Sequence, residues 1–167
     1  MNRKLFRSLM LLLAAFTLSP SRAFCLDETR AMSTLRQKAE QGDAWGQDLL
    51  GIFYYYGSQG VKPDYAEAAK WFHLAAQQGH ADAQFNIGVM YSNGQGVKQD
   101  YFEAVKWYRK AAAQGHADAQ FNLGVAYTNG NGVEKSYALA KDWFRTACNN
   151  GNQRGCSQAR ILEQKGH

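Results

Sequence analysis

A stretch of nineteen residues at 79–97, GHADAQFNIGVMYSNGQGV, returns thirty-six positions later as GHADAQFNLGVAYTNGNGV. Aligning the glycines extends the same pattern to three units, at 43–79, 80–115 and 116–151. A repeat of this length is typical of a stack of like helical or strand units, because each unit buries its apolar face against the next one. The repeat therefore constrains the fold more than any single motif in the chain.

Each unit is predicted to contain two helices. In the second unit Ala83, Ile87 and Tyr91 recur at helical spacing and form one apolar stripe. Gly88 lies inside this stripe, where glycine costs about 1 kcal/mol relative to alanine. Its recurrence in all three units predicts that a neighbouring helix approaches too closely for a methyl group. Gly115 then ends the second helix, so the expected fold class is all-α.

The N-terminal residues 1–23 have the order of a secretory signal peptide: a basic start, an apolar run and small residues before the expected cleavage after Ala23. Removing them takes away Arg3, Lys4, Arg7 and Arg22, so the formal charge falls from +5 to 15 − 14 = +1. A nearly neutral chain gives no reason to expect a nucleic-acid partner. We expect a periplasmic or secreted protein with no membrane insertion after cleavage.

The pattern of the units resembles the Sel-1-like repeat, a relative of the tetratricopeptide repeat. The second unit carries every element of that pattern: Ala81, Ala83, Ile87-Gly88, Tyr91, Gly94, Gly96-Val97, Asp100-Tyr101, Ala104, Trp107, Ala111-Ala112 and Gly115. The resemblance implies a right-handed α/α solenoid of three helix-turn-helix repeats. It also implies an N-terminal capping helix at 24–42 and a C-terminal capping helix at 152–167.

Cysteine use fits an exported chain. Three cysteines in an oxidising compartment predict one disulfide and one remaining thiol. Cys148 and Cys156 have the C-x7-C spacing at which cysteine-rich relatives of this family join adjacent helices, so the resemblance implies a bridge between them. Cys25 is then expected to be unpaired within the chain and available to link two copies into a homodimer.

Histidines one repeat apart, His80 and His116, invite a metal hypothesis. They occupy the position after a helix-ending glycine, where Asp43 and Asn152 stand in other units, and this position favours N-cap residues. We therefore predict that they begin helices, and we expect no metal and no cofactor. No S-x-x-K, G-x-S-x-G, H-E-x-x-H or C-x-x-C motif is present, so no catalytic residues are predicted.

The first helices of tetratricopeptide arrays line a concave groove that binds peptides, and the resemblance carries this role to the corresponding positions here. They are Trp45, Asp48, Ile52, Tyr55 and Tyr56 in the first unit, Asp82, Phe85, Asn86, Val89 and Asn93 in the second, and Asp118, Phe121, Asn122, Val125 and Asn129 in the third. Two interpretations stay open: these side chains bind a protein or peptide partner, or they pack between neighbouring units.

The function predicted from these features is a non-enzymatic, exported protein–protein interaction module that acts as an adaptor or scaffold. A narrower alternative is a periplasmic immunity protein against a secreted antibacterial effector. The rival class is a β-lactamase-like enzyme, an activity described for some cysteine-rich relatives, which the absent S-x-x-K motif disfavours.

Overall fold

The computed structural model describes residues 32–57 and 62–166. The predicted signal peptide at 1–23, Cys25 and the first part of the predicted capping helix at 24–42 lie outside the described residues.

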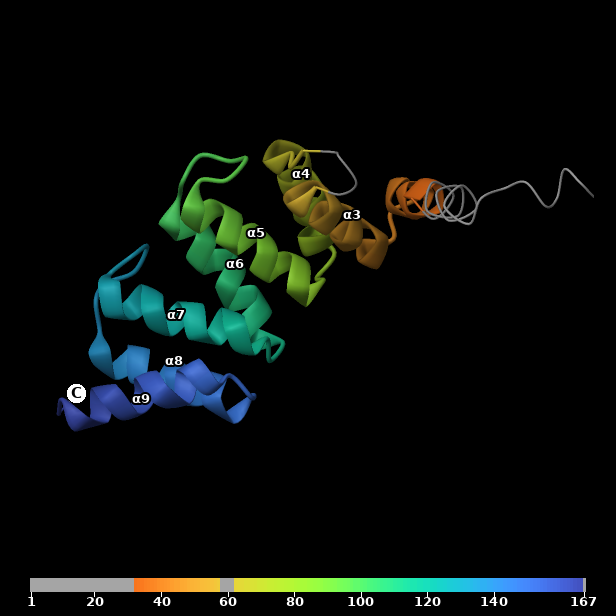
Figure 1. Ribbon diagram of the computed structural model, residues 1–167. Coiled ribbons are helices and arrows are strands. Elements are labelled where there is room, and N and C mark those ends of the chain that lie inside the picture. The colour runs from red at the N-terminus through yellow and green to blue at the C-terminus, as the bar shows by residue number, and fades with distance from the viewer. Residues whose placement is uncertain (1–31, 58–61, 167) are drawn as a thin grey trace, which may run out of the picture.

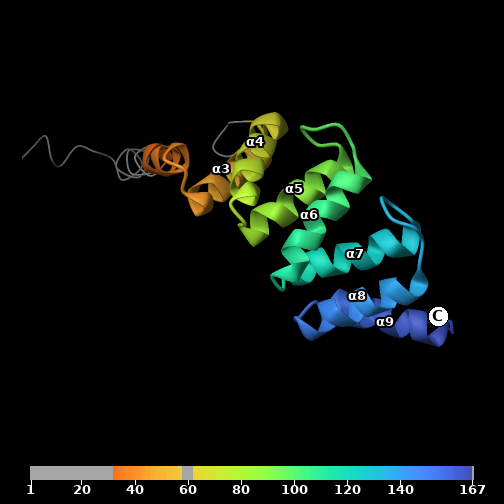
Figure 2. The same ribbon diagram turned by 180° about the vertical axis from the view of Figure 1, so that it is seen from behind.

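Helices follow one another through the described ranges, and no strand occurs in them. After a helix at 32–40 come α3 (Ala44–Tyr56), α4 (Tyr65–Gln77), α5 (Ala81–Asn93), α6 (Tyr101–Ala113), α7 (Ala117–Asn129), α8 (Tyr137–Asn149) and α9 (Gln153–Gln164). Consecutive helices pack against each other, and Figure 1 shows the pairs stacked in chain order from the orange N-terminal helix to blue α9. The reverse view in Figure 2 shows the same curved row. The predicted all-α solenoid is confirmed. Within the two described ranges, no helix is long and apolar enough to cross a membrane.

The glycine in each apolar stripe lies where the two helices of a unit come closest. A Cβ atom added to Gly51, Gly88 or Gly124 would lie 2.6, 2.7 or 2.5 Å from the aromatic ring of the second helix of the same unit. These rings belong to Phe72, Tyr108 and Phe144, respectively. The predicted close approach of a neighbouring helix is therefore confirmed.

Histidine begins α5 and α7, as predicted. The Nδ1 atom of His80 accepts a hydrogen bond from the backbone N–H of Ala83 at 3.3 Å, and His116 accepts from Ala119 at 3.2 Å. A neutral imidazole has one nitrogen that accepts and one that donates, so both rings must be in the tautomer that carries its proton on Nε2.

A buried glutamine links each unit to the helix before it. Its side-chain amide donates to a backbone carbonyl eight residues earlier: Gln47 to Ala39, Gln84 to Ala76 and Gln120 to Ala112. At the last junction the same two positions hold Cys156 and Cys148, and the structure joins them by a disulfide. The bridge that the family resemblance implied thus replaces a repeated hydrogen bond and ties α9 to α8.

Candidate functional site

Most of the predicted groove residues are accessible on the first helices of the units. Trp45 and Tyr56 are 57% and 73% exposed, and Asp82, Asn93 and Asn129 are exposed as well. Nine more are half-buried: Ile52, Tyr55, Phe85, Asn86, Val89, Asp118, Phe121, Asn122 and Val125. Asp48 differs from all of these, because it is only 4% exposed and lies beneath the surface.

Six of these residues meet in one depression between α3 and α5, with α4 behind it. This depression, the aromatic hollow, has a volume of about 270 Å³. Its lining consists of Ile52, Tyr55, Tyr56, Phe72, Phe85, Asn86 and Val89. Tyr55 donates its hydroxyl proton to Gln95 of the next unit at 3.1 Å, so its ring is held in place at the junction of two units.

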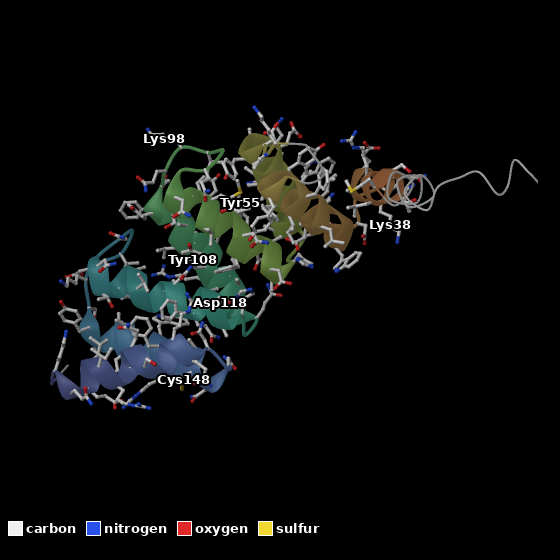
Figure 3. The ribbon with its side chains drawn as sticks, viewed as in Figure 1. Lys38, Tyr55, Lys98, Tyr108, Asp118 and Cys148 are labelled. Carbon is white, nitrogen blue, oxygen red and sulfur yellow. A yellow bond between two sulfur atoms is a disulfide. The ribbon has the colours of Figure 1, made fainter. Side chains whose placement is uncertain are left out.

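A second depression lies one unit further along, between α5 and α7, with α6 behind it. This polar hollow has a volume of about 290 Å³. Its lining consists of Val89, Ser92, Asn93, Tyr101, Ala104, Val105, Tyr108, Asn122, Val125, Ala126 and Asn131. Figure 3 labels Tyr108, which comes from α6 and lies between α5 and α7, and Tyr55, which comes from α3.

The two hollows are built from equivalent positions of consecutive units. Ile52, Tyr55, Tyr56, Phe72, Asn86 and Val89 around the first correspond in the repeat register to Val89, Ser92, Asn93, Tyr108, Asn122 and Val125 around the second. Val89 lines both, so the hollows adjoin along α5. The same architecture therefore offers aromatic rings in one hollow and hydroxyl and amide groups in the next.

Tyr108 is the residue that sequence reasoning missed. Its hydroxyl has the polar side chains of Asn122 and Ser92 beside it, which lower the pKa of the phenol, but burial has the larger effect and raises this pKa above its usual value of 10.0. Tyr108 therefore stays neutral and presents a hydroxyl at the base of the polar hollow. The sequence carries a signal for it, because the equivalent positions hold Phe72 and Phe144.

Asn86 and Asn122 occupy equivalent positions of two consecutive units, but their amides have different surroundings. The amide of Asn86 donates to the Asp48 carboxylate at 3.2 Å. For Asn122 the position that corresponds to Asp48 holds Phe85, and the polar group beside its amide is the Tyr108 hydroxyl. The amide of Asn122 therefore belongs to the polar hollow, whereas that of Asn86 is tied to a buried acid beside the aromatic hollow.

Several of the predicted groove residues connect neighbouring units. The carboxylate of Asp82 lies 3.3 Å from His116 Nε2. Asp118 accepts hydrogen bonds from Asn152 at 2.7 Å and from Arg154 at 2.9 Å. These two acids line neither hollow.

The two phenylalanines also contact the following unit. Phe85 stacks on His116 with ring centroids 4.6 Å apart, while also lining the aromatic hollow. Phe121 lies 5.3 Å from the ring of Phe144 in its own unit, and the guanidinium of Arg154 on the following helix, α9, covers it at 4.5 Å. Packing between units is thus part of what both side chains do, and Phe121 lines neither hollow.

Asp48, His80 and Asp82 form the group of possible metal ligands in the described part of the chain, with their ligand atoms within 4.8 Å of one another. His80 Nδ1 is occupied by the Ala83 N–H, so only Nε2 remains for a metal. Binding there would move the imidazole proton to Nδ1 and break the helix cap. Burial raises the pKa of Asp48, which disfavours the carboxylate form that a metal needs. The chemistry of this cluster suits a helix start better than a metal site.

Comparison with known proteins places these features in a family. The Sel1 repeat matches residues 46–80, 81–116 and 117–152. A crystal structure of a protective antigen from uropathogenic Escherichia coli, described as displaying an SLR fold, has a TM-score of 0.79 and 43% identity. The similarity covers 83% of this chain and 29% of that one. Helicobacter pylori cysteine rich protein B shares the fold with a TM-score of 0.61 at 22% identity, over 84% and 97% of the two chains.

Curated relatives match over shorter stretches. The ERAD-associated E3 ubiquitin-protein ligase component HRD3B of Arabidopsis thaliana is 38% identical over 74 residues, and human protein sel-1 homolog 2 is 37% identical over 86. These matches cover 42% and 48% of this chain and 12% of each relative. The chain thus spans about an eighth of the length of these relatives. Sel1 repeats generally serve as protein-interaction modules. With three units matched over most of its described length, the chain belongs to the Sel1 repeat family.

Proposed function

We propose that this protein is a non-enzymatic adaptor that binds an extended segment of a partner protein across the aromatic and polar hollows. The observation that carries this proposal is the pair of adjoining depressions built from equivalent positions on α3, α5 and α7. A regular array with like depressions suits an extended chain, whose side chains also recur at regular intervals.

The lining of the two hollows indicates what the bound segment looks like. Neither lining contains a charged residue. A charged side chain entering either hollow would lose water without gaining a partner of opposite charge, which is unfavourable. We therefore infer an uncharged segment, with an apolar or aromatic side chain in the aromatic hollow. An amide or hydroxyl side chain would bond to Tyr108 and Asn122 in the polar hollow.

The relatives support a role within complexes. The Arabidopsis relative is named as a component of an E3 ubiquitin-protein ligase, which is a multi-protein assembly. The proposal takes from it only the general role of joining proteins, because the present chain covers 12% of that relative.

Export to the periplasm or the medium is the second part of this proposal. The order of residues 1–23 and the disulfide between Cys148 and Cys156 both support it, since disulfides persist outside the cytosol. Mass spectrometry of the protein isolated from its producing cells tests this directly. A mature chain that begins at Phe24 is expected, and an intact N-terminus on a cytosolic protein would contradict export.

Binding is tested by selecting peptides from a random display library on the purified protein and titrating the selected peptides against variants. Tyr56→Ala changes the aromatic hollow and Tyr108→Phe changes the polar one. Trp45→Ala serves as the matched control, because Trp45 is exposed on the same helix as Tyr56 but lines neither hollow. We expect the first two variants to weaken binding and the control to bind like the wild type. Selected peptides that respond only to Trp45→Ala would overturn the proposed site.

A further inference from the structure

Among the described residues, three pairs of side chains join neighbouring units, and the two residues of each pair lie eighteen positions apart in the sequence. Arg36 donates to the Tyr54 hydroxyl at 2.5 Å, and Arg109 donates to the Tyr127 hydroxyl at 3.0 Å. Arg145 forms an ion pair with Glu163. Each link runs from one helix to the first helix of the following unit.

One junction lacks this link. Between α4 and α5 the equivalent positions hold His73 and Tyr91, and in the described structure no hydrogen bond joins them. The shorter imidazole packs instead against the Trp107 ring in a T-shaped arrangement, with ring centroids 5.5 Å apart. The hydroxyl of Tyr91 therefore faces a position that an arginine fills in the junctions before and after.

An open depression occurs at this junction. It has a volume of about 620 Å³ and is here called the outer hollow. Its lining consists of Ala66, Ala69, Lys70, His73, Leu74, Ile87, Tyr91, Gly96 and Val97. Three of these explain the open space, because the next unit has larger or charged side chains at the same positions: Phe102 for Ala66, Arg109 for His73 and Lys110 for Leu74.

The outer hollow combines an apolar wall with a polar edge. Alanine, leucine, isoleucine and valine side chains supply most of its surface. Lys70 is the charged member of the described residues that line it, and no acidic residue does so. Tyr91 offers a hydroxyl proton, and the imidazole of His73 carries at least one N–H in either protonation state. This set of donors fits an anionic head group on an apolar body.

Lys70 can turn toward such a ligand. Its ammonium pairs with Glu67 one turn earlier, and its side chain is 67% exposed. The hydrogen bond to Glu67 raises the pKa of Lys70, so the side chain is cationic at neutral pH. Exposed ion pairs of this kind contribute little to stability, so exchanging one carboxylate for another costs little.

We propose that the outer hollow binds a medium-chain carboxylic acid in its ionised form. The hydrocarbon chain lies against Ala66, Ile87 and Val97, and the carboxylate accepts hydrogen bonds from Lys70 and Tyr91. A site of several hundred cubic ångströms with an apolar lining and a few polar groups is typical for ligands of this size. This site is separate from the aromatic and polar hollows, with which it shares no lining residue.

The test is calorimetric titration of the full-length protein with decanoate, below the concentration at which decanoate forms micelles, and with decanol for comparison. We expect saturable binding of decanoate and about tenfold weaker binding of decanol, which lacks the charge that Lys70 recognises. Lys70→Gln and Tyr91→Phe should each reduce the preference for decanoate while leaving decanol binding nearly unchanged.

Ala66→Phe is the obstructing variant, because it places a ring at the rim of the outer hollow, where the equivalent Phe102 is 70% exposed. The equivalent Phe102 shows that the repeat accommodates phenylalanine there, and circular dichroism checks that the variant folds. We expect decanoate binding to be weakened in this variant and unchanged in Tyr56→Ala, which alters only the aromatic hollow. Absence of saturable binding to the wild type, or undiminished binding to Ala66→Phe, would overturn the proposal.

Discussion

Tyr108 on α6 and Asn122 on α7 line the same polar hollow, so a hydroxyl from the interior of one unit lies beside a half-buried amide of the next. The corresponding phenylalanines in the other units have no such group. This hydroxyl adds to the polar side chains of Ser92, Asn93, Asn122 and Asn131 that line the second hollow.

Replacing Tyr108 by phenylalanine should therefore alter recognition more than stability. The ring still packs against Gly88, as Phe72 packs against Gly51, and only the hydroxyl with its polar contacts is lost. We expect the free energy of unfolding to fall by about 1 kcal/mol or less, since that is the net value of an ordinary hydrogen bond. Binding of a selected peptide should weaken about fivefold to tenfold, because 1.4 kcal/mol corresponds to a factor of ten. Titration and urea denaturation measure the two effects, and equal binding by the variant would contradict this role.

Gly124→Ala tests the close contact between the helices of a unit. The new Cβ would lie 2.5 Å from the Phe144 ring, which is itself fully buried and has little room to move. We expect a loss of about 1–3 kcal/mol in the free energy of unfolding, as for other overpacked cores. Asn129→Ala, at the exposed end of the same helix, is the control and should change stability little. A variant as stable as the wild type would mean that α7 and α8 can separate at low cost.

Asp48→Asn should make the protein more stable at neutral pH. Burial raises the pKa of Asp48 above 3.8, so the folded state favours the protonated acid and its ionisation opposes folding. This cost is absent below the ordinary pKa of aspartate. It grows as the pH rises from the ordinary pKa to the raised pKa, and it is complete above the raised pKa. Asparagine avoids the charge and can still accept the Asn86 hydrogen bond.

The expected gain for Asp48→Asn is up to about 1 kcal/mol at pH 7, and it should vanish near pH 3. Chemical denaturation at a series of pH values measures it. Asp118→Asn is the control, because this half-buried acid is paired with Arg154 and its replacement should not stabilise the protein. If Asp48→Asn were less stable at pH 7, the hydrogen bond from Asn86 to the carboxylate would have to outweigh the burial of the acid.

His73→Arg should stabilise the junction between α4 and α5. The longer side chain can reach the Tyr91 hydroxyl as Arg109 reaches Tyr127, which adds one partly exposed hydrogen bond. We expect a gain of about 0.5–1 kcal/mol in the free energy of unfolding. The gain should disappear when Tyr91→Phe is introduced as well. A double-mutant cycle measured by thermal denaturation isolates this pair, and an equal effect of His73→Arg with or without the Tyr91 hydroxyl would show that the bond does not form.

The sequence allowed the fold to be predicted because each determinant is local and occurs three times. Gly88 within its apolar stripe and His80 after Gly79 predicted the close helix contact and the helix start, and the structure confirms both. The groove was harder to predict, because its chemistry depends on residues about forty positions apart. Asn86 and Asn122 occupy equivalent positions of the repeat but have different neighbours. Asn86 is hydrogen-bonded to Asp48, whereas the residue of the next unit that corresponds to Asp48 is Phe85.

Residues that the repeat register predicted to share one exposed face differ in how deeply they are buried. Asp48 was predicted to line the groove with Tyr55, but the aspartate is 4% exposed and bonded to Asn86. The outer hollow carried no sequence signal of its own, because it arises from three side chains that are smaller or less polar than their counterparts. Such a deficit becomes visible only when the junctions between units are compared in three dimensions.

The disulfide between Cys148 and Cys156 makes the two ends of the stack unequal in stability. Earlier junctions use a reversible glutamine hydrogen bond at these positions, whereas the final one is covalent. A linear array opens most readily at its ends, where a unit has one neighbour instead of two. With its C-terminal end fastened, the described array should open first at the helix 32–40 and α3. Reduction of the bridge would make both ends comparable, so the redox state of the surroundings determines at which end the protein begins to unfold.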